Sequence, residues 1–244
     1  LLDRALKEQA VRIEIVHPAA RLVALEDALN DRFGLTDAVV VDVPDTEDEQ
    51  LARERVADAA ADHLATIAPT GVIGVSWGRT MIELANRLQP GWTRADQIVQ
   101  LNGAISRSKQ PTRYQEVVER FGTTTGAAIQ LMPAPAIVGT SELREALEAD
   151  PSVAAPLKAA RKAQSAVFGM GVMGADSVHV TSGYLDKRDQ RRLQKAGAVG
   201  DVLGRFITID GRIALPELDE RTVGLPLSKL CGKQTVGLAA GPGR

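Results

Sequence analysis

Short apolar runs alternate with longer amphipathic patterns through the first hundred residues, and this alternation leaves few folds open to the chain. Near-continuous apolar strands separated by helices are typical of a parallel sheet covered on both faces. The pattern therefore predicts an α/β fold with a doubly wound, mostly parallel sheet. The strands expected here are Val11–Val16, Ala38–Val43, Gly71–Val75 and Ile98–Leu101, and the helices are Ala19–Phe33, Glu47–Ile67 and Thr80–Leu88.

The second half is less regular, but it carries the same two kinds of pattern. Asp210-Gly211 is a strong turn signal and predicts a hairpin within Phe206–Leu215. The chain ends with a strand from Thr235 that leads into a glycine turn. The other strands expected are Ala127–Leu131, Ala166–Gly169 and Ser177–Thr181, and the helices are Glu142–Glu148, Ala155–Gln164 and Arg188–Lys195.

Charge and cysteine content exclude several classes of function. With 29 basic and 31 acidic residues the net charge is −2, whereas a chain that mainly grips nucleic-acid phosphates needs a basic excess. The single cysteine, Cys231, excludes a disulfide framework and a multi-cysteine metal site. The three histidines are scattered, and no apolar run approaches the ~18 residues of a membrane span. We expect a soluble cytoplasmic protein with no cofactor, no metal and no membrane partner.

The loop Gly74-Val75-Ser76-Trp77-Gly78-Arg79-Thr80 lies between an expected strand and an expected helix. Small residues there let the backbone aim its N–H groups outward at the positive end of the helix, which is an anion site most often occupied by phosphate. The Ser76 and Thr80 hydroxyls add donors, and Arg79 adds a positive charge. A structural turn without a ligand is the alternative.

Two catalytic motifs share letters with this loop. A Walker A loop ends in Gly-Lys-Ser/Thr, which is absent here. Gly74-x-Ser76-x-Gly78 matches a nucleophile elbow, and a serine hydrolase would also need an acid and a histidine later in the chain. The only later histidine, His179, falls inside an expected strand. Phosphate binding is therefore favoured over hydrolysis.

Two further loops follow expected strands. Gly169-Met170-Gly171-Val172-Met173-Gly174 matches the letters of a dinucleotide fingerprint, but a strand pattern follows it instead of a long helix. The fingerprint is therefore weak, although the loop suits a ligand contact at the end of a strand. The segment after Asn102-Gly103 is basic, with Arg107, Lys109 and Arg113, and either closes over an anion or is a solvated loop.

Four segments together carry a family resemblance: Gly74–Thr80, Gln100-Leu101-Asn102-Gly103, Leu131-Met132-Pro133-Ala134-Pro135, and Gly197–Asp201 leading into Gly204-Arg205-Phe206. In this order and spacing they resemble the effector domain of SorC/DeoR-type sugar-binding transcriptional regulators. The resemblance implies a Rossmann-like fold related to sugar-phosphate isomerases and deaminases. It implies residues 1–10 as a linker helix from a missing N-terminal helix-turn-helix domain, and residues 11–244 as the effector domain.

The resemblance also implies a function and a site. The expected function is binding of a phosphorylated sugar that modulates DNA binding by the separate domain, without catalysis, in a homo-oligomer that meets operator DNA only through that domain. The alternatives are a sugar-phosphate isomerase with Asp201 as base, or a serine hydrolase on Ser76. Where the family has a phosphate-binding lysine this chain has Arg244, which keeps the charge but forms no Schiff base. The expected phosphate contacts are Ser76, Gly78, Arg79, Thr80 and Arg244, and the expected sugar contacts are Asn102, Gly103, Lys109, Gly169 and Asp201.

Overall fold

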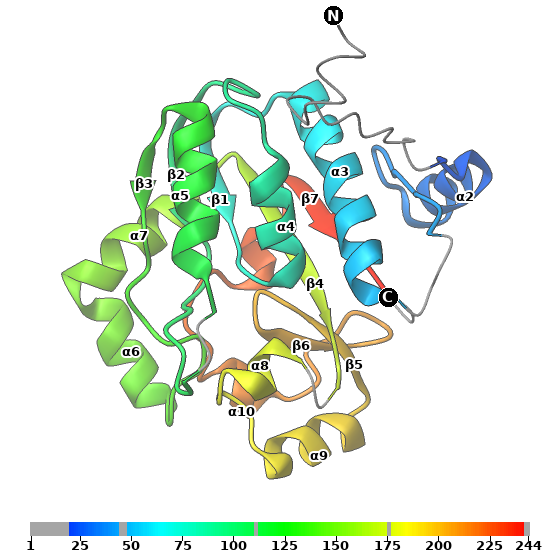
Figure 1. Ribbon diagram of the computed structural model, residues 1–244. Helices are drawn as coiled ribbons and strands as arrows, with labels where there is room; N and C mark the ends of the chain where they lie inside the picture. The colour runs from blue at the N-terminus through cyan, green and yellow to red at the C-terminus, as the bar shows by residue number, and fades with distance from the viewer. Residues whose placement is uncertain (1–19, 44–47, 110–111, 175–176, 242–244) are drawn as a thin grey trace, which may run out of the picture. The chain divides into compact units, whose positions relative to one another are not determined.

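The structure is a computed structural model, and it describes residues 20–43, 48–109, 112–174 and 177–241 (Figure 1). The expected linker helix 1–10, the expected strand Val11–Val16 and Arg244 lie outside these residues. By its contacts the chain divides into two units, Leu1–Asp42 and Val43–Arg244, which we describe separately.

The first unit contains helix α2 (Val23–Phe33), which ends at Gly34 in the left-handed conformation. Its one buried helical residue, Glu26, accepts hydrogen bonds from the Arg21 guanidinium and from the backbone N–H of Val40. The expected strand Ala38–Val43 is wrong. Its single ladder contact in the described chain is an isolated antiparallel bridge between Val41 and Arg21, because a β-branched run forms a strand only where a partner strand meets it.

The second unit is built on five parallel strands in the spatial order β3-β2-β1-β4-β7. The apolar runs of the sequence predict these strands well, since strands buried on both faces are apolar almost throughout. Beyond the carboxyl half of β4 the sheet continues through an antiparallel pair, β5 and β6. The strands are β1 (Gly71–Val75), β2 (Ala95–Gln100), β3 (Ala128–Gln130), β4 (Ser165–Val172), β5 (Ala198–Val202), β6 (Arg205–Thr208) and β7 (Gln234–Leu238).

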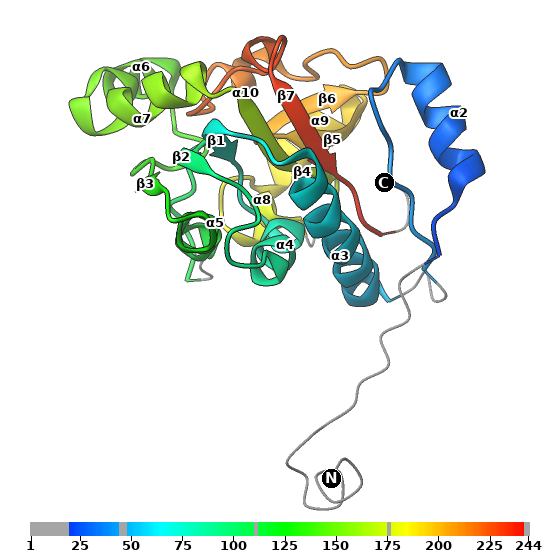
Figure 2. The same cartoon turned by 90° about the horizontal axis from the view of Figure 1, so that it is seen from above.

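Helices cover both faces of the parallel strands, as a doubly wound sheet requires (Figure 2). Alternate strand residues serve the two sides: Ile98 packs in the cluster beneath α3–α5, whereas its neighbour Val99 packs with residues of α7. One face carries α3 (Glu49–Ile67), α4 (Arg79–Arg87) and α5 (Tyr114–Thr125), and the other carries α7 (Pro151–Lys162) beside α6 (Ser141–Ala149).

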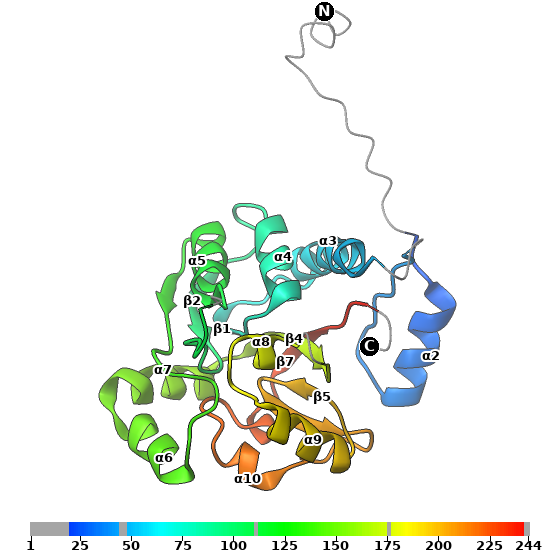
Figure 3. The same ribbon diagram turned by 60° about the horizontal axis from the view of Figure 1, so that its bottom comes forward.

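Near the antiparallel pair the structure differs from the sequence-based expectation (Figure 3). Residues 177–181, expected as a strand, form a short helix, α8 (Val178–Thr181), with Thr181 N–H donating to Ser177 O at 3.0 Å. Tertiary contacts override the β-propensity of Val178 and Val180. The turn at Asp210-Gly211 is present, but the strand β6 that precedes it pairs mainly with β5. The remaining elements are α9 (Lys187–Lys195), α10 (Pro216–Asp219) and the 3-10 turn Leu227–Lys229.

Candidate ligand-binding site

A pocket opens at the carboxyl ends of β1 and β4, where open α/β sheets place their ligands. It encloses about 640 Å³, including solvent at its mouth. Loops far apart in the sequence meet there because parallel strands end at the same edge of the sheet. The pocket is lined by residues 76–81 after β1, Asn102 after β2, residues 169–172 of β4, residues 177–179, Asp201, Leu203 and Gly204.

One end of the pocket is formed by the N-terminus of α4. Gly78, with φ 138°, is the cap residue and offers no side chain to the first N–H groups of the helix. By contrast, the N-cap carboxylates Asp48 and Asp186 accept from the first backbone N–H groups of α3 and α9. No side chain caps the start of α4, whose residues 78–81 line the pocket, so this end of the helix suits an anionic group.

Buried hydroxyl groups lie beside these donors. The side chains of Ser76 and Thr80 are both buried and line the pocket. Ser76 Oγ accepts a hydrogen bond from Gly169 N–H at 3.3 Å, which ties the loop after β1 to β4. Arg79 is the first residue of α4, and its guanidinium lies 3.8 Å from the Glu49 carboxylate of α3. This end of the pocket presents hydrogen-bond donors and positive potential.

Asp201 of β5 contributes a hydrogen-bond acceptor with a negative charge instead of a donor. Its Oδ2 accepts from Gly204 N–H at 3.1 Å and pairs with His179 Nε2 at 3.0 Å. Leu203 and Gly204 both have positive φ, 56° and 78°, as a type I′ hairpin turn requires, and this turn brings the Gly204 N–H back to Asp201. The buried carboxylate is therefore held in one orientation before any ligand arrives.

His179 is oriented by rings on several sides. Its ring centroid lies 5.7 Å from that of Trp77, 5.3 Å from Phe206 and 6.3 Å from Tyr184. Burial raises the pKa of Tyr184 to about 12, so this hydroxyl stays protonated and donates to the Ile105 carbonyl at 2.6 Å. The imidazole therefore has little freedom to turn away from Asp201.

Seven of the residues expected to bind ligand lie around this one pocket. The expected residue Gly103 does not line it: its N–H donates to Val223 O, and its carbonyl accepts from Trp77 Nε1. Lys109 is exposed and lies outside the lining, and Arg244 lies beyond the described residues. The seven are Ser76, Gly78, Arg79, Thr80, Asn102, Gly169 and Asp201.

His179 lines the pocket, although sequence reasoning did not place it among the ligand-binding residues. Its position as the only histidine after the Ser76 loop could have indicated a role in the site. We expected it inside a strand, however, and the structure places it on α8. The structure brings it into contact with Asp201 rather than with the elbow serine. Among the hydrogen bonds of the described residues, none joins Ser76 to His179, so the arrangement is not that of a serine hydrolase.

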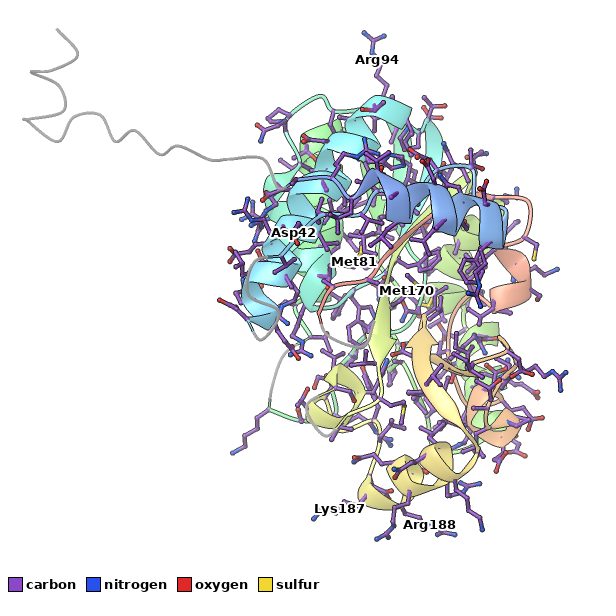
Figure 4. The ribbon with its side chains drawn as sticks, turned by 90° about the vertical axis from the view of Figure 1, so that its right-hand side faces the viewer. Asp42, Met81, Arg94, Met170, Lys187 and Arg188 are labelled. Atoms are coloured by element: carbon purple, nitrogen blue, oxygen red, sulfur yellow. The ribbon has the colours of Figure 1, made fainter. Side chains whose placement is uncertain are left out.

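Two kinds of feature are absent from the described residues. They hold no group of three or more histidine, cysteine or acidic side chains that would suit a metal ion. No helix in this part of the chain has the length and apolar character needed to cross a membrane. The basic side chains Lys187 and Arg188 extend from α9 into solvent, as expected for an exposed helix face (Figure 4).

Comparison with known proteins gives a consistent result. The family model described as "Putative sugar-binding domain" matches residues 17–244. The chain is 28% identical to the deoxyribonucleoside regulator of Bacillus subtilis over 244 residues, covering 100% of this chain and 78% of that protein. It is 29% identical to the transcriptional regulator LsrR of Klebsiella pneumoniae, covering 99% and 73%.

Solved structures give the same picture. A domain of a possible sugar-binding transcriptional regulator from Arthrobacter aurescens superposes with a TM-score of 0.80 at 29% identity, covering 91% of this chain and 86% of that one. A DeoR family transcriptional regulator from Listeria monocytogenes superposes with a TM-score of 0.76 at 26% identity, covering 89% and 87%.

Proposed function

The chain belongs to the family of sugar-binding domains of DeoR- and SorC-type transcriptional regulators, and we propose that its effector is a phosphorylated sugar held in the pocket above β1 and β4. It is an effector-binding regulatory domain and not an enzyme. We propose that DNA binding is carried by another part of the full-length regulator.

The observation that carries the proposal is the donor set at the start of α4. Uncapped backbone N–H groups from Gly78 onward lie beside the buried hydroxyls of Ser76 and Thr80, and Arg79 adds charge. A dianionic phosphate satisfies several such donors at once, with hydrogen bonds strengthened by its charge. We assign the phosphate to this end. Arg244, which follows the last strand in sequence, is proposed as a further phosphate contact.

The sugar is then assigned to the other end. A carboxylate repels phosphate but accepts well from hydroxyl groups, so Asp201 suits the sugar, and Asn102 and Gly169 of the same pocket lining are proposed as further sugar contacts. Lys109 belongs to the proposal as a cation on the loop that is fastened to α8, where Ser108 Oγ donates to Thr181 O at 2.7 Å. Gly103 supports the pocket by close backbone packing.

Isothermal titration calorimetry with ribose 5-phosphate, glucose 6-phosphate and their unphosphorylated sugars tests the assignment. We expect a phosphorylated sugar to bind and its parent to bind far more weakly. Thr80→Val should weaken binding of the phosphate ester roughly ten- to a hundredfold, the value of a hydrogen bond to a charged group. Thr66→Val, an exposed position on α3, is the matched control. Equal affinity for sugar and sugar phosphate would refute the proposal.

Control of DNA affinity needs a second state that the ligand favours. We propose that the chain forms homo-oligomers and that sugar phosphate binds one arrangement of subunits more tightly than another. The relatives include transcriptional regulators, and symmetric regulators suit the repeated half-sites of DNA operators. Sedimentation velocity with and without ribose 5-phosphate measures this. A monomer at high micromolar concentration in both conditions would remove this route of control.

A further inference from the structure

Two buried atoms of pocket-lining side chains have no hydrogen-bond partner in the described part of the chain. They are Asn102 Oδ1, after β2, and His179 Nδ1, on α8. Both side chains are about nineteen-twentieths buried or more, with exposed fractions of 3% and 5%. A buried acceptor without a donor costs free energy, so such atoms mark places where a ligand or an ordered water completes the structure.

The tautomer of the neutral His179 imidazole follows from its partner. Asp201 Oδ2 already accepts from Gly204 N–H, and a carboxylate oxygen only accepts, so the contact at 3.0 Å puts the proton on His179 Nε2. In the neutral imidazole the other nitrogen, Nδ1, is then an acceptor. Asp201 thus determines the hydrogen-bonding character of an atom on the far side of the ring.

The pocket lining therefore gathers acceptors from three separate parts of the chain. Asp201 contributes a carboxylate from β5, His179 a ring nitrogen from α8, and Asn102 an amide oxygen after β2. The donors, in contrast, lie at the start of α4. A group that contacts these acceptors must bring hydrogen-bond donors, and the hydroxyl groups of a sugar are such donors.

Building on the proposed function, we propose that His179 and Asn102 form, with Asp201, a hydroxyl-reading subsite that selects fully hydroxylated sugar phosphates over deoxy sugar phosphates. A ligand that lacks the hydroxyl leaves a buried acceptor unpaired, which is the condition under which hydrogen bonding discriminates most strongly. The expected preference is roughly ten- to a hundredfold for the hydroxyl that is read.

Matched ligand pairs test this directly. Calorimetry compares ribose 5-phosphate with 2-deoxyribose 5-phosphate, and glucose 6-phosphate with 2-deoxyglucose 6-phosphate. We expect the hydroxylated member of at least one pair to bind ten times more tightly or better. His179→Gln keeps an N–H that reaches toward Asp201 but removes the ring acceptor, and Asn102→Ala removes the amide. Each should reduce that ratio toward one, whereas His63→Gln on α3 should leave it unchanged.

A second measurement does not depend on the variants folding. Nitrogen-15 NMR of the wild-type imidazole should show Nε2 protonated and Nδ1 unprotonated, with the Nδ1 signal moving when ribose 5-phosphate is added. If no sugar phosphate binds, the proposed function fails together with this proposal. If sugar phosphates bind but both members of each pair bind equally, if both variants preserve the ratio, or if Nδ1 carries the proton, only the hydroxyl-reading subsite is overturned.

Discussion

The Asp201 carboxylate occupies the space where a side chain at Gly171 would begin: a Cβ on Gly171 would lie 2.0 Å from Asp201 Oδ1. Gly171 pairs with Asp201 across the antiparallel contact of β4 and β5. Gly171, in the glycine-rich run 169–174, is therefore required because it leaves room for the Asp201 carboxylate, and not because a dinucleotide approaches it.

Gly171→Ala should displace the Asp201 carboxylate and leave the fold intact, because the atom in the way is the end of a side chain. We expect affinity for a bound sugar phosphate to fall roughly ten- to a hundredfold, measured by calorimetry. Gly139→Ala, whose Cβ meets nothing within 4 Å, is the control. Since Gly171→Ala acts through Asp201, adding it to Asp201→Asn should change affinity little further; full additivity would contradict this reading.

Gly103→Ala should destabilise the protein. Its Cβ would lie 2.2 Å from the carbonyl oxygen of Pro135, and backbone atoms cannot swing aside as a side chain can. Overpacking of this kind costs about 1–3 kcal/mol of unfolding free energy. Urea denaturation measures it, again with Gly139→Ala as reference. An unchanged midpoint would show that the segment Ala134–Pro135 moves freely.

Arg205 fastens the segment that supports Asn102. Its buried guanidinium donates to the carbonyl oxygens of Leu225, Asp219, Thr222 and Gly224, and contacts the Asp219 carboxylate at 2.5 Å. Arg205→Met leaves these acceptors unpaired, and we expect it to lower the unfolding free energy by about 3 kcal/mol.

Arg205→Lys should recover only part of that loss, because one ammonium cannot replace a planar fork with five donors. Chemical denaturation checks both variants against Arg94→Met, whose side chain extends into solvent (Figure 4). A full recovery by lysine would mean that charge alone, not the hydrogen-bond geometry, holds the segment.

The stability of the first unit should depend on pH through the ionisation of Glu26. Hydrogen bonds from Arg21 lower the pKa of Glu26 below its ordinary value, and the Val40 N–H reinforces this. For a lowered carboxyl pKa, the stabilisation is present above the unfolded value of about 4.3 and is lost as pH falls through the folded value. The Val40 amide NMR signal should titrate below pH 4.3, and this titration should vanish in Glu26→Gln.

Local sequence was sufficient to predict the structure where residues close together in the chain form one element. Gly71–Val75 was predicted with its observed bounds because a strand buried on both faces needs an apolar side chain at nearly every position. The four loop residues Ser76, Gly78, Arg79 and Thr80 reach one pocket for a similar reason: they are close in sequence, so one strand–turn–helix element positions all of them.

Local sequence gave wrong predictions where the pairing between strands decides whether a segment is a strand. Val178 and Val180 are β-branched and alternate as in a strand, yet they belong to α8, and Ala38–Val43 lacks the partner that a strand needs. The prediction of His179 as a strand residue followed from this, and for that reason its place in the pocket lining was missed.

By itself, the sequence determined the α/β class, the parallel strands and the donor end of the pocket, because each depends on the order of apolar, small and polar residues over a few positions. Asp201 entered the predicted site only through family resemblance. The tertiary structure decided that His179 meets Asp201, that Gly171 makes room for the Asp201 carboxylate, and that Asn102 lines the same pocket. These residues lie on separate elements. Their separation along the chain does not predict the distances between them, because the packing of the sheet determines those distances.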